Sequence, residues 1–165
     1  MKGRILMTQI DKVLEKICRM ALFIFFMLMV ASAFIQVVLR TLFNNPLTWT
    51  EELCRYSMVW LTMIGSALAV KYGSHIAVDI LKTAISLRAI RIIDKLNYIL
   101  IAVFSFVLVY YGFILCSRNM SQITPGLKLP MGLVYGAMPV GGIIMLFNVC
   151  MGLCSSGQKE DKPCQ

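Results

Sequence analysis

The amino-acid sequence predicts an all-α integral membrane protein in which four transmembrane helices form one membrane domain, residues 1–165. Hydrophobic residues make up 59% of the chain and its mean hydropathy is +0.78, which is more apolar surface than a soluble core of this size can bury. Four apolar runs also stand out, each close to the roughly 20 residues that cross a bilayer core. They cover residues 20–39, 50–70, 96–117 and 131–153.

The first span follows an amphipathic stretch, residues 10–19, in which apolar side chains recur at helical spacing. We expect this stretch to form an interfacial helix that leads into the span. The charged leader, the apolar run and Ala31-Ser32-Ala33 also match the pattern of a cleaved signal peptide. Because apolar sequence resumes at Phe34 and completes a full-length span, we expect the segment to be retained.

Charges mark the start of the second span. Thr48 and Glu51 have the spacing of a capping box, and Glu51 and Glu52 fall in the first turn, where the helix dipole favours negative charge. Arg55 follows both acids at pairing distance. The three charged residues serve either as dipole and pairing residues at a water-facing helix end or as a network that binds a partner. An uncharged stretch then leads towards Gly73, where we expect the helix to end.

The connection to the third span is predicted to hold a second amphipathic helix, residues 75–86, that lies in the headgroup plane. Its polar face includes His75 and Asp79, which form either a solvated pair or a pH-sensing or partner-docking site. Ser86 is expected to cap the third helix.

Small residues recur in the second and fourth spans and predict close helix packing. They are Thr62, Gly65, Ser66, Ala69, Gly132, Gly136, Gly141 and Gly142. Pro139 removes one backbone hydrogen bond and predicts a kink in the outer third of the fourth span. Trp49 suits the interfacial aromatic belt, whereas Trp60 lies deeper and is expected to pack between helices.

The basic residues give the chain an orientation. Of the 16 Lys and Arg residues, 12 precede the first span, lie between the second and third, or follow the fourth. The positive-inside rule therefore places both termini in the cytoplasm, with residues 155–165 as a short disordered tail. The net charge of +8 is thus a topology signal, and no nucleic-acid partner is predicted, because the basic residues lie in short segments at membrane ends.

Reactive chemistry is scarce, and we predict no catalytic residue, cofactor or metal ligand. The middle of each span lacks ionisable side chains, which ion and substrate pathways normally carry. The six Cys residues form no C-x-x-C pair, although Cys54 and Cys116 are both expected near the outer face and could oxidise together. A cytochrome-type anchor subunit would need haem ligands within the spans, and a self-sufficient oligomeric exporter would need a carboxylate there; both remain alternatives.

Several motifs resemble the small membrane subunit (the DctQ-like, Q component) of tripartite ATP-independent periplasmic (TRAP) transporters. They are QVVLR (36–40), PLTWTEELCR (46–55), Trp60, Gly65, GSHIAVD (73–79) and TPGLKLPMGLVYGAMPVGG (124–142). Within these motifs and beside them, the candidate interface or structural residues are Arg40, Trp49, Glu51, Glu52, Arg55, Trp60, Gly65, His75, Asp79, Tyr135, Pro139 and Gly141.

The resemblance implies a subunit of a multi-pass transporter in the bacterial inner membrane. Its partners would be a large permease subunit, a periplasmic substrate-binding protein and membrane lipid. In this family the large subunit holds the substrate and coupling-ion sites, usually for sodium and an organic acid, and the small subunit braces it. The outer loops would face the periplasm, where Arg118 and Lys128 are candidate contacts for the binding protein.

Overall fold

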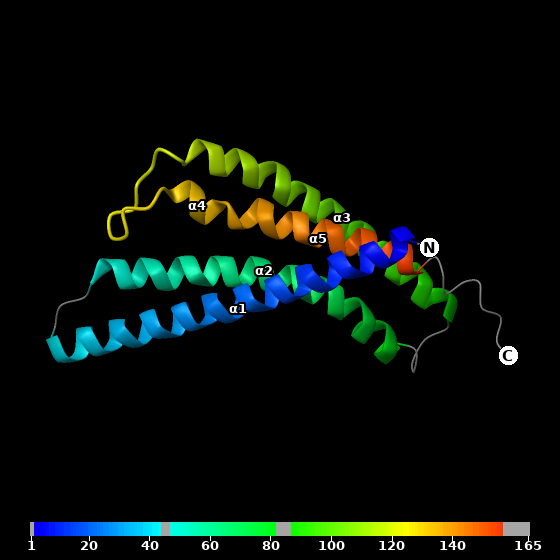
Figure 1. Cartoon of the computed structure of the whole chain (residues 1–165), viewed down its shortest axis with the longest axis horizontal. Coiled ribbons are helices and arrows are strands. Elements are labelled where there is room, and N and C mark those ends of the chain that lie inside the picture. The colour runs from blue at the N-terminus through cyan, green and yellow to red at the C-terminus, as the bar shows by residue number, and fades with distance from the viewer. Residues whose placement is uncertain (1, 44–46, 82–86, 157–165) are drawn as a thin grey trace.

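The computed structural model describes residues 2–43, 47–81 and 87–156 (Figure 1). Its helices are α1 (Lys2–Phe43), α2 (Thr48–Leu81), α3 (Leu87–Arg118), α4 (Met131–Tyr135) and α5 (Ala137–Ser156). Four segments are long and apolar enough to cross a membrane, which confirms the predicted all-α membrane class. They are Asp11–Leu42, Thr48–Tyr72, Lys95–Arg118 and Met131–Gly152.

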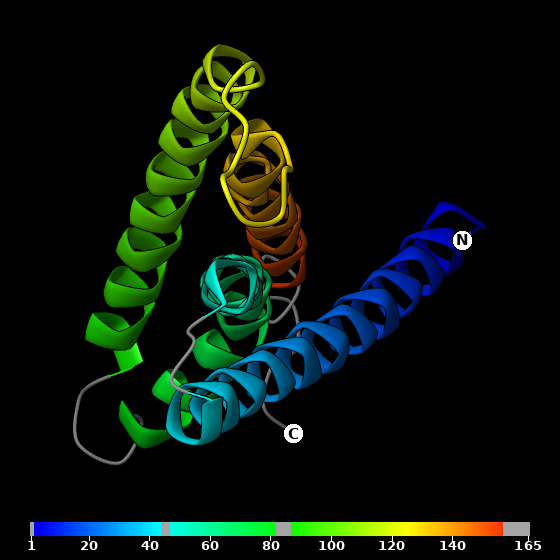
Figure 2. The ribbon, with the colours of Figure 1, turned by 90° about the vertical axis from the view of Figure 1, so that its left-hand side faces the viewer.

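The long helices form an open row (Figures 1 and 2). α1 packs on α2, α2 on α5, and α5 on α3, whereas within the described residues the backbone of α1 does not come close to α3 or α5. α1 begins and α5 ends at the same end of the row, which we call the terminal end. The opposite end carries the loop of residues 119–130, and we call it the loop end.

Two helices are longer than the sequence indicated. Residues 10–19 are not a separate helix, since they belong to the continuous α1. The expected helix end at Gly73 is wrong, because α2 continues to Leu81. One glycine costs a helix only about 1 kcal/mol, and no proline follows it to stop the helix. The expected amphipathic helix 75–86 therefore begins as the last turns of α2, and its remainder, with the predicted Ser86 cap, lies outside the described residues.

The capping box expected at the start of α2 is also wrong. Thr48 is itself the first helical residue, and the carboxylate of Glu51 accepts a hydrogen bond from Arg55 instead. Thr50 makes the local side-chain contact, donating its hydroxyl to the carbonyl of Leu47 at 2.7 Å.

The fourth apolar run is interrupted in its outer third, as Pro139 predicts. The proline ring clashes with the carbonyl four residues earlier, and that residue, Tyr135, is the last of α4. The chain turns at Gly136, whose N–H donates to the carbonyl of Gly132 at 2.9 Å. Pro139 itself lies in the first turn of α5, where a missing N–H costs no helical hydrogen bond.

Glycines allow α5 to pack tightly between two neighbours. A Cβ atom at Gly141 would lie 3.0 Å from Cβ of Met63 on α2, and one at Gly142 would lie 2.8 Å from Cγ2 of Val109 on α3. Gly65 differs from the packing expected of it, since its nearest neighbour would be 3.7 Å away, an ordinary contact. The centre of the row is therefore the α2–α5–α3 layer, held by close backbone approach.

Candidate functional site

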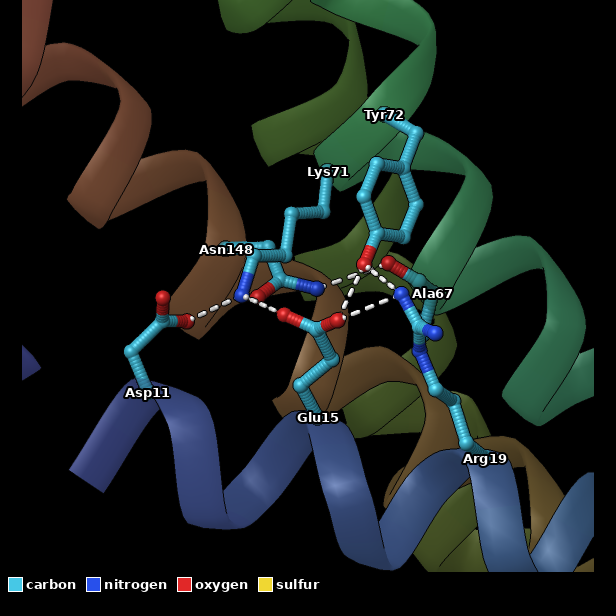
Figure 3. A network of polar contacts seen from close by, with 7 residues as sticks. All are labelled: Asp11, Glu15, Arg19, Ala67, Lys71, Tyr72 and Asn148. Atoms are coloured by element: carbon cyan, nitrogen blue, oxygen red, sulfur yellow. Dashed lines mark hydrogen bonds and ion pairs between the residues drawn. The ribbon is translucent and has the colours of Figure 1, made fainter. Parts of the chain in front are cut away.

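Five side chains form a polar cluster at the terminal end, the α1–α2 network (Figure 3). They are Asp11, Glu15 and Arg19 of α1 and Lys71 and Tyr72 of α2. Lys71 donates to Oδ1 of Asp11 at 2.7 Å and to Oε2 of Glu15 at 2.9 Å. Arg19 pairs with Oε1 of Glu15 at 2.7 Å and donates to the hydroxyl of Tyr72, which itself donates to Glu15.

The spacing of residues on each helix explains this network. Asp11, Glu15 and Arg19 are four residues apart, so they share one face of α1. Lys71 is the first charge on α2 after an uncharged stretch, and only 22% of its side chain is exposed. Two acids and two bases balance one another, so the network fastens α1 to α2 and leaves no net charge for a ligand.

Asn148 adds a buried contact beside the network. Its side-chain amide donates to the carbonyl of Ala67 at 2.7 Å and so joins α5 to α2 (Figure 3). Amide side chains within membrane helices commonly bond across an interface in this way. Sequence reasoning missed Asn148, although it is a lone polar residue within an otherwise apolar run.

Glu52 organises the loop end. The residue is only 9% exposed, and its two carboxylate oxygens accept the backbone N–H groups of Gly126 at 3.0 Å and Leu127 at 2.9 Å. A charged acceptor makes these hydrogen bonds stronger than neutral ones. A Cβ atom at Gly126 would lie 2.9 Å from the backbone of Trp49, so the loop lies directly on the start of α2. Glu52 is thus an internal anchor for the 119–130 loop.

The loop has a defined conformation of its own. The backbone N–H of Thr124 donates to the carbonyl of Leu129 at 2.9 Å, and the N–H of Leu129 donates to Oγ1 of Thr124 at 3.1 Å. Ile123 and Pro130 form an antiparallel bridge, and Lys128 adopts a positive φ of 53°. A non-glycine residue rarely takes this conformation, so the surrounding hydrogen bonds must hold it.

The other predicted residues fall into different environments. Glu51 and Arg55 pair at 2.6 Å on the surface of α2, with 55% and 68% of their side chains exposed, and they do not join Glu52 at the loop. Trp60 packs between helices as expected, stacking on Phe25 of α1 with ring centroids 5.6 Å apart. Arg40 and Trp49 are exposed. The side chains of His75 and Asp79 lie outside the described residues, so their pairing stays a prediction.

An exposed stripe of small and polar residues runs along α2, the α2 stripe. It consists of Thr62, Ser66 and Ala69, and the large apolar side chain of Met58 is exposed one turn before Thr62. The hydroxyl of Thr62 donates to the carbonyl of Met58 at 2.9 Å, and that of Ser66 donates to the carbonyl of Thr62. The exposed faces of α1 and α3 carry large apolar side chains instead, among them Phe23, Phe26, Phe34, Phe104, Phe106 and Phe113.

The described cysteines are free thiols. The thiol of Cys116 donates to the carbonyl of Gly132 at 3.1 Å, and joint oxidation of Cys54 and Cys116 stays a hypothesis. Among the side chains that the structure describes, no three of His, Cys, Asp or Glu lie together in a way that could hold a metal ion.

Comparison with known proteins gives a consistent result. A family model described as tripartite ATP-independent periplasmic transporters, DctQ component, matches residues 29–156. The C4-dicarboxylate TRAP transporter small permease protein DctQ of Rhodobacter capsulatus is 32% identical over 78% of this chain, which spans 59% of that relative's length. A putative TRAP transporter small permease protein of Haemophilus influenzae is 29% identical over 82% of both chains. The sialic acid TRAP transporter permease protein SiaT of the same species is 25% identical over 68% of this chain and 18% of its own length.

Proposed function

Because this chain belongs to the DctQ component of TRAP transporters, we propose that it acts as a small permease subunit that braces a larger one during uptake of an organic acid. That family is a transporter permease component, which is not an enzyme class. We further propose that a periplasmic binding protein delivers the substrate and that an ion gradient drives uptake. Relatives named for C4-dicarboxylate and sialic acid support this substrate class.

The uncovered α2 stripe is the observation that carries the bracing role. A face that meets lipid normally presents large apolar side chains, as the outer faces of α1 and α3 do. Small residues and hydroxyls mark a face where another helix backbone approaches closely. Because the open row leaves the α2 stripe uncovered, it is the best candidate surface for a membrane-spanning helix of the larger subunit.

The relative SiaT supports a large partner. A segment similar to this chain makes up only 18% of SiaT, so in that permease it shares one polypeptide with a much longer remainder. We propose that the same association is made here between separate chains.

The placement of ionisable groups supports an accessory role. In the segment of α2 that is apolar enough to cross a membrane, Thr48–Tyr72, charged side chains lie near the two ends, with Glu51, Glu52 and Arg55 at one and Lys71 at the other. A path for ions or acids usually needs ionisable groups deep within the membrane. We therefore propose that the substrate and coupling-ion sites belong to the larger subunit.

The distribution of basic residues supports an orientation in the bacterial inner membrane. Since 12 of the 16 Lys and Arg residues precede the first span, lie between the second and third, or follow the fourth, we propose that the terminal end and both termini are cytoplasmic. The loop end would then face the periplasm. Arg118 and Lys128 are exposed there and are the proposed contacts for the binding protein.

Co-purification with the larger permease subunit tests this function. Thr62→Trp with Ser66→Trp would fill the α2 stripe, and we expect the pair to abolish co-purification of the larger subunit and sodium-driven uptake of labelled organic acids. Val103→Trp with Val107→Trp is the matched control, because these residues have the same four-residue spacing on the exposed face of α3.

The controls separate the interface from general damage. We expect the α3 pair to retain both co-purification and uptake. If both double variants lose co-purification equally, or if the Thr62→Trp, Ser66→Trp variant keeps full uptake, the α2 stripe is not the contact with the larger subunit. Uptake by this chain alone would refute the accessory role itself.

A further inference from the structure

α1 is much longer than a bilayer core requires. Its 42 residues correspond to about 63 Å of helix, against roughly 30 Å of hydrocarbon. The segment of α1 that is apolar enough to cross a membrane, Asp11–Leu42, is itself about 48 Å long, so its first turns can lie at the headgroup level while the rest crosses the hydrocarbon. Side chains on these turns meet the membrane surface instead of its centre.

A shallow groove runs along the outer face of these turns. The residues that line it are Val13, Lys16, Ile17, Met20, Ala21 and Ile24. All six come from α1, and three large apolar side chains are widely exposed, Val13 by 57%, Ile17 by 60% and Met20 by 59%. Ala21 is the small residue between them and forms a hollow. The groove therefore offers apolar surface to a ligand at headgroup depth.

Lys16 lines this groove, and Lys12 precedes the groove on α1. Lys12 and Lys16 are exposed and one helical turn apart, so their ammonium groups can reach the same ligand. Within the described residues neither lysine pairs with an acid, whereas Arg19 and Lys71 are paired within the α1–α2 network. Like charges at this spacing repel each other, and a bound anion would relieve that repulsion.

We propose that the groove is a binding site for an anionic phospholipid. The phosphate would lie between Lys12 and Lys16, and the upper part of an acyl chain would cover Ile17 and Met20. A soluble anion would satisfy the lysines but leave the apolar side chains exposed, whereas an amphiphile covers both. Long basic side chains beside an apolar surface suit this arrangement, since their stems can lie along it while the charge remains at the headgroups.

Native mass spectrometry of the full chain in mild detergent tests this site, using phosphatidylglycerol and phosphatidylcholine with identical acyl chains. Two lysines near a lipid surface correspond to a preference for the anionic lipid of up to about thirtyfold. We expect Lys12→Gln with Lys16→Gln to remove the preference while binding of phosphatidylcholine is unchanged. Lys12→Arg with Lys16→Arg should keep it.

The matched control is Lys95→Gln with Lys128→Gln, which removes the same charge from two other exposed lysines. It should keep the preference. The proposal is overturned if the wild-type chain binds both lipids equally, if the control loses the preference as well, or if soluble glycerol phosphate displaces the lipid, which would indicate an anion site alone. Because no partner is needed, failure here leaves the proposed bracing role intact, and failure of co-purification leaves the lipid site intact.

Discussion

The contact between α3 and α5 at Gly112 yields the sharpest stability prediction. A Cβ atom there would lie 2.8 Å from Cδ of Pro139, 2.9 Å from Cβ of Met138 and 3.0 Å from the backbone nitrogen of Pro139. None of these atoms is the free end of a flexible side chain, so Gly112→Ala must push α5 away from α3. Overpacking of this kind costs about 1–3 kcal/mol, against a gain in helix propensity of about 1 kcal/mol.

We expect a net loss of up to about 2 kcal/mol for Gly112→Ala, which lowers the melting temperature by up to about 4–8 °C in a chain of this size. Thermal melts of the purified protein in mild detergent, followed by circular dichroism, would measure it. Gly65→Ala is the matched control, because its new methyl group has room and its helix gains propensity, so it should melt at or slightly above the wild-type temperature.

The packing argument requires that Gly112→Ala lowers the melting temperature while Gly65→Ala does not. If Gly112→Ala melts at or above the wild-type temperature, α3 and α5 are not in close contact there. If both variants lose stability equally, the loss reflects a general intolerance of the helices and not the contact with Pro139.

Three further predictions concern the polar contacts. Lys71→Met should let α1 separate from α2, seen as a longer distance between spin labels on the two helices, whereas Arg55→Met, which breaks an exposed pair, should leave that distance unchanged. Glu52→Gln should speed amide hydrogen exchange at residues 124–129, because an amide accepts with one oxygen only; unchanged exchange would contradict the anchor. Asn148→Leu should cost about 0.6 kcal/mol, or roughly 1–2 °C of melting temperature, and no loss would exclude a contribution from its bond to α2.

The sequence predicted the elements that depend on local chemistry. Hydropathy predicted the apolar runs, and the missing N–H of Pro139 predicted the interruption near it. The depth of Trp60 in its span predicted that it packs between helices. The prediction that α2 ends at Gly73 was wrong, because a glycine weakens a helix without ending it. Gly65 likewise has the spacing of a packing residue, but spacing does not say how closely a neighbour approaches, and Leu22 of α1 makes only an ordinary contact with it.

The polar clusters join residues too far apart in sequence to be paired by inspection. Lys71 lies 60 positions from Asp11, and Glu52 lies 74 from Gly126. The sequence held one signal for the first cluster. Asp11 and Glu15 lie four residues apart on α1, and Arg19 has the spacing to pair with Glu15 but not with Asp11. Lys71 is the only charge at the matching depth of α2 and so was the candidate partner. No comparable signal existed for Glu52, because its partners are backbone N–H groups, which every loop possesses.

The two clusters act on the same helix at opposite ends, and this bears on the proposed role. Lys71 fastens α2 to α1 at the end of the membrane-crossing segment Thr48–Tyr72, while Glu52 fastens the start of that segment to the 119–130 loop and hence to α4. Between them, Gly141 and Asn148 hold the buried side of α2 against α5. The α2 stripe is therefore presented on a membrane-crossing segment that is fixed near both of its ends and along its back. A brace requires a surface that stays in place when its partner moves. α2 meets that requirement better than α1, whose backbone, within the described residues, comes close to α2 but not to α3 or α5.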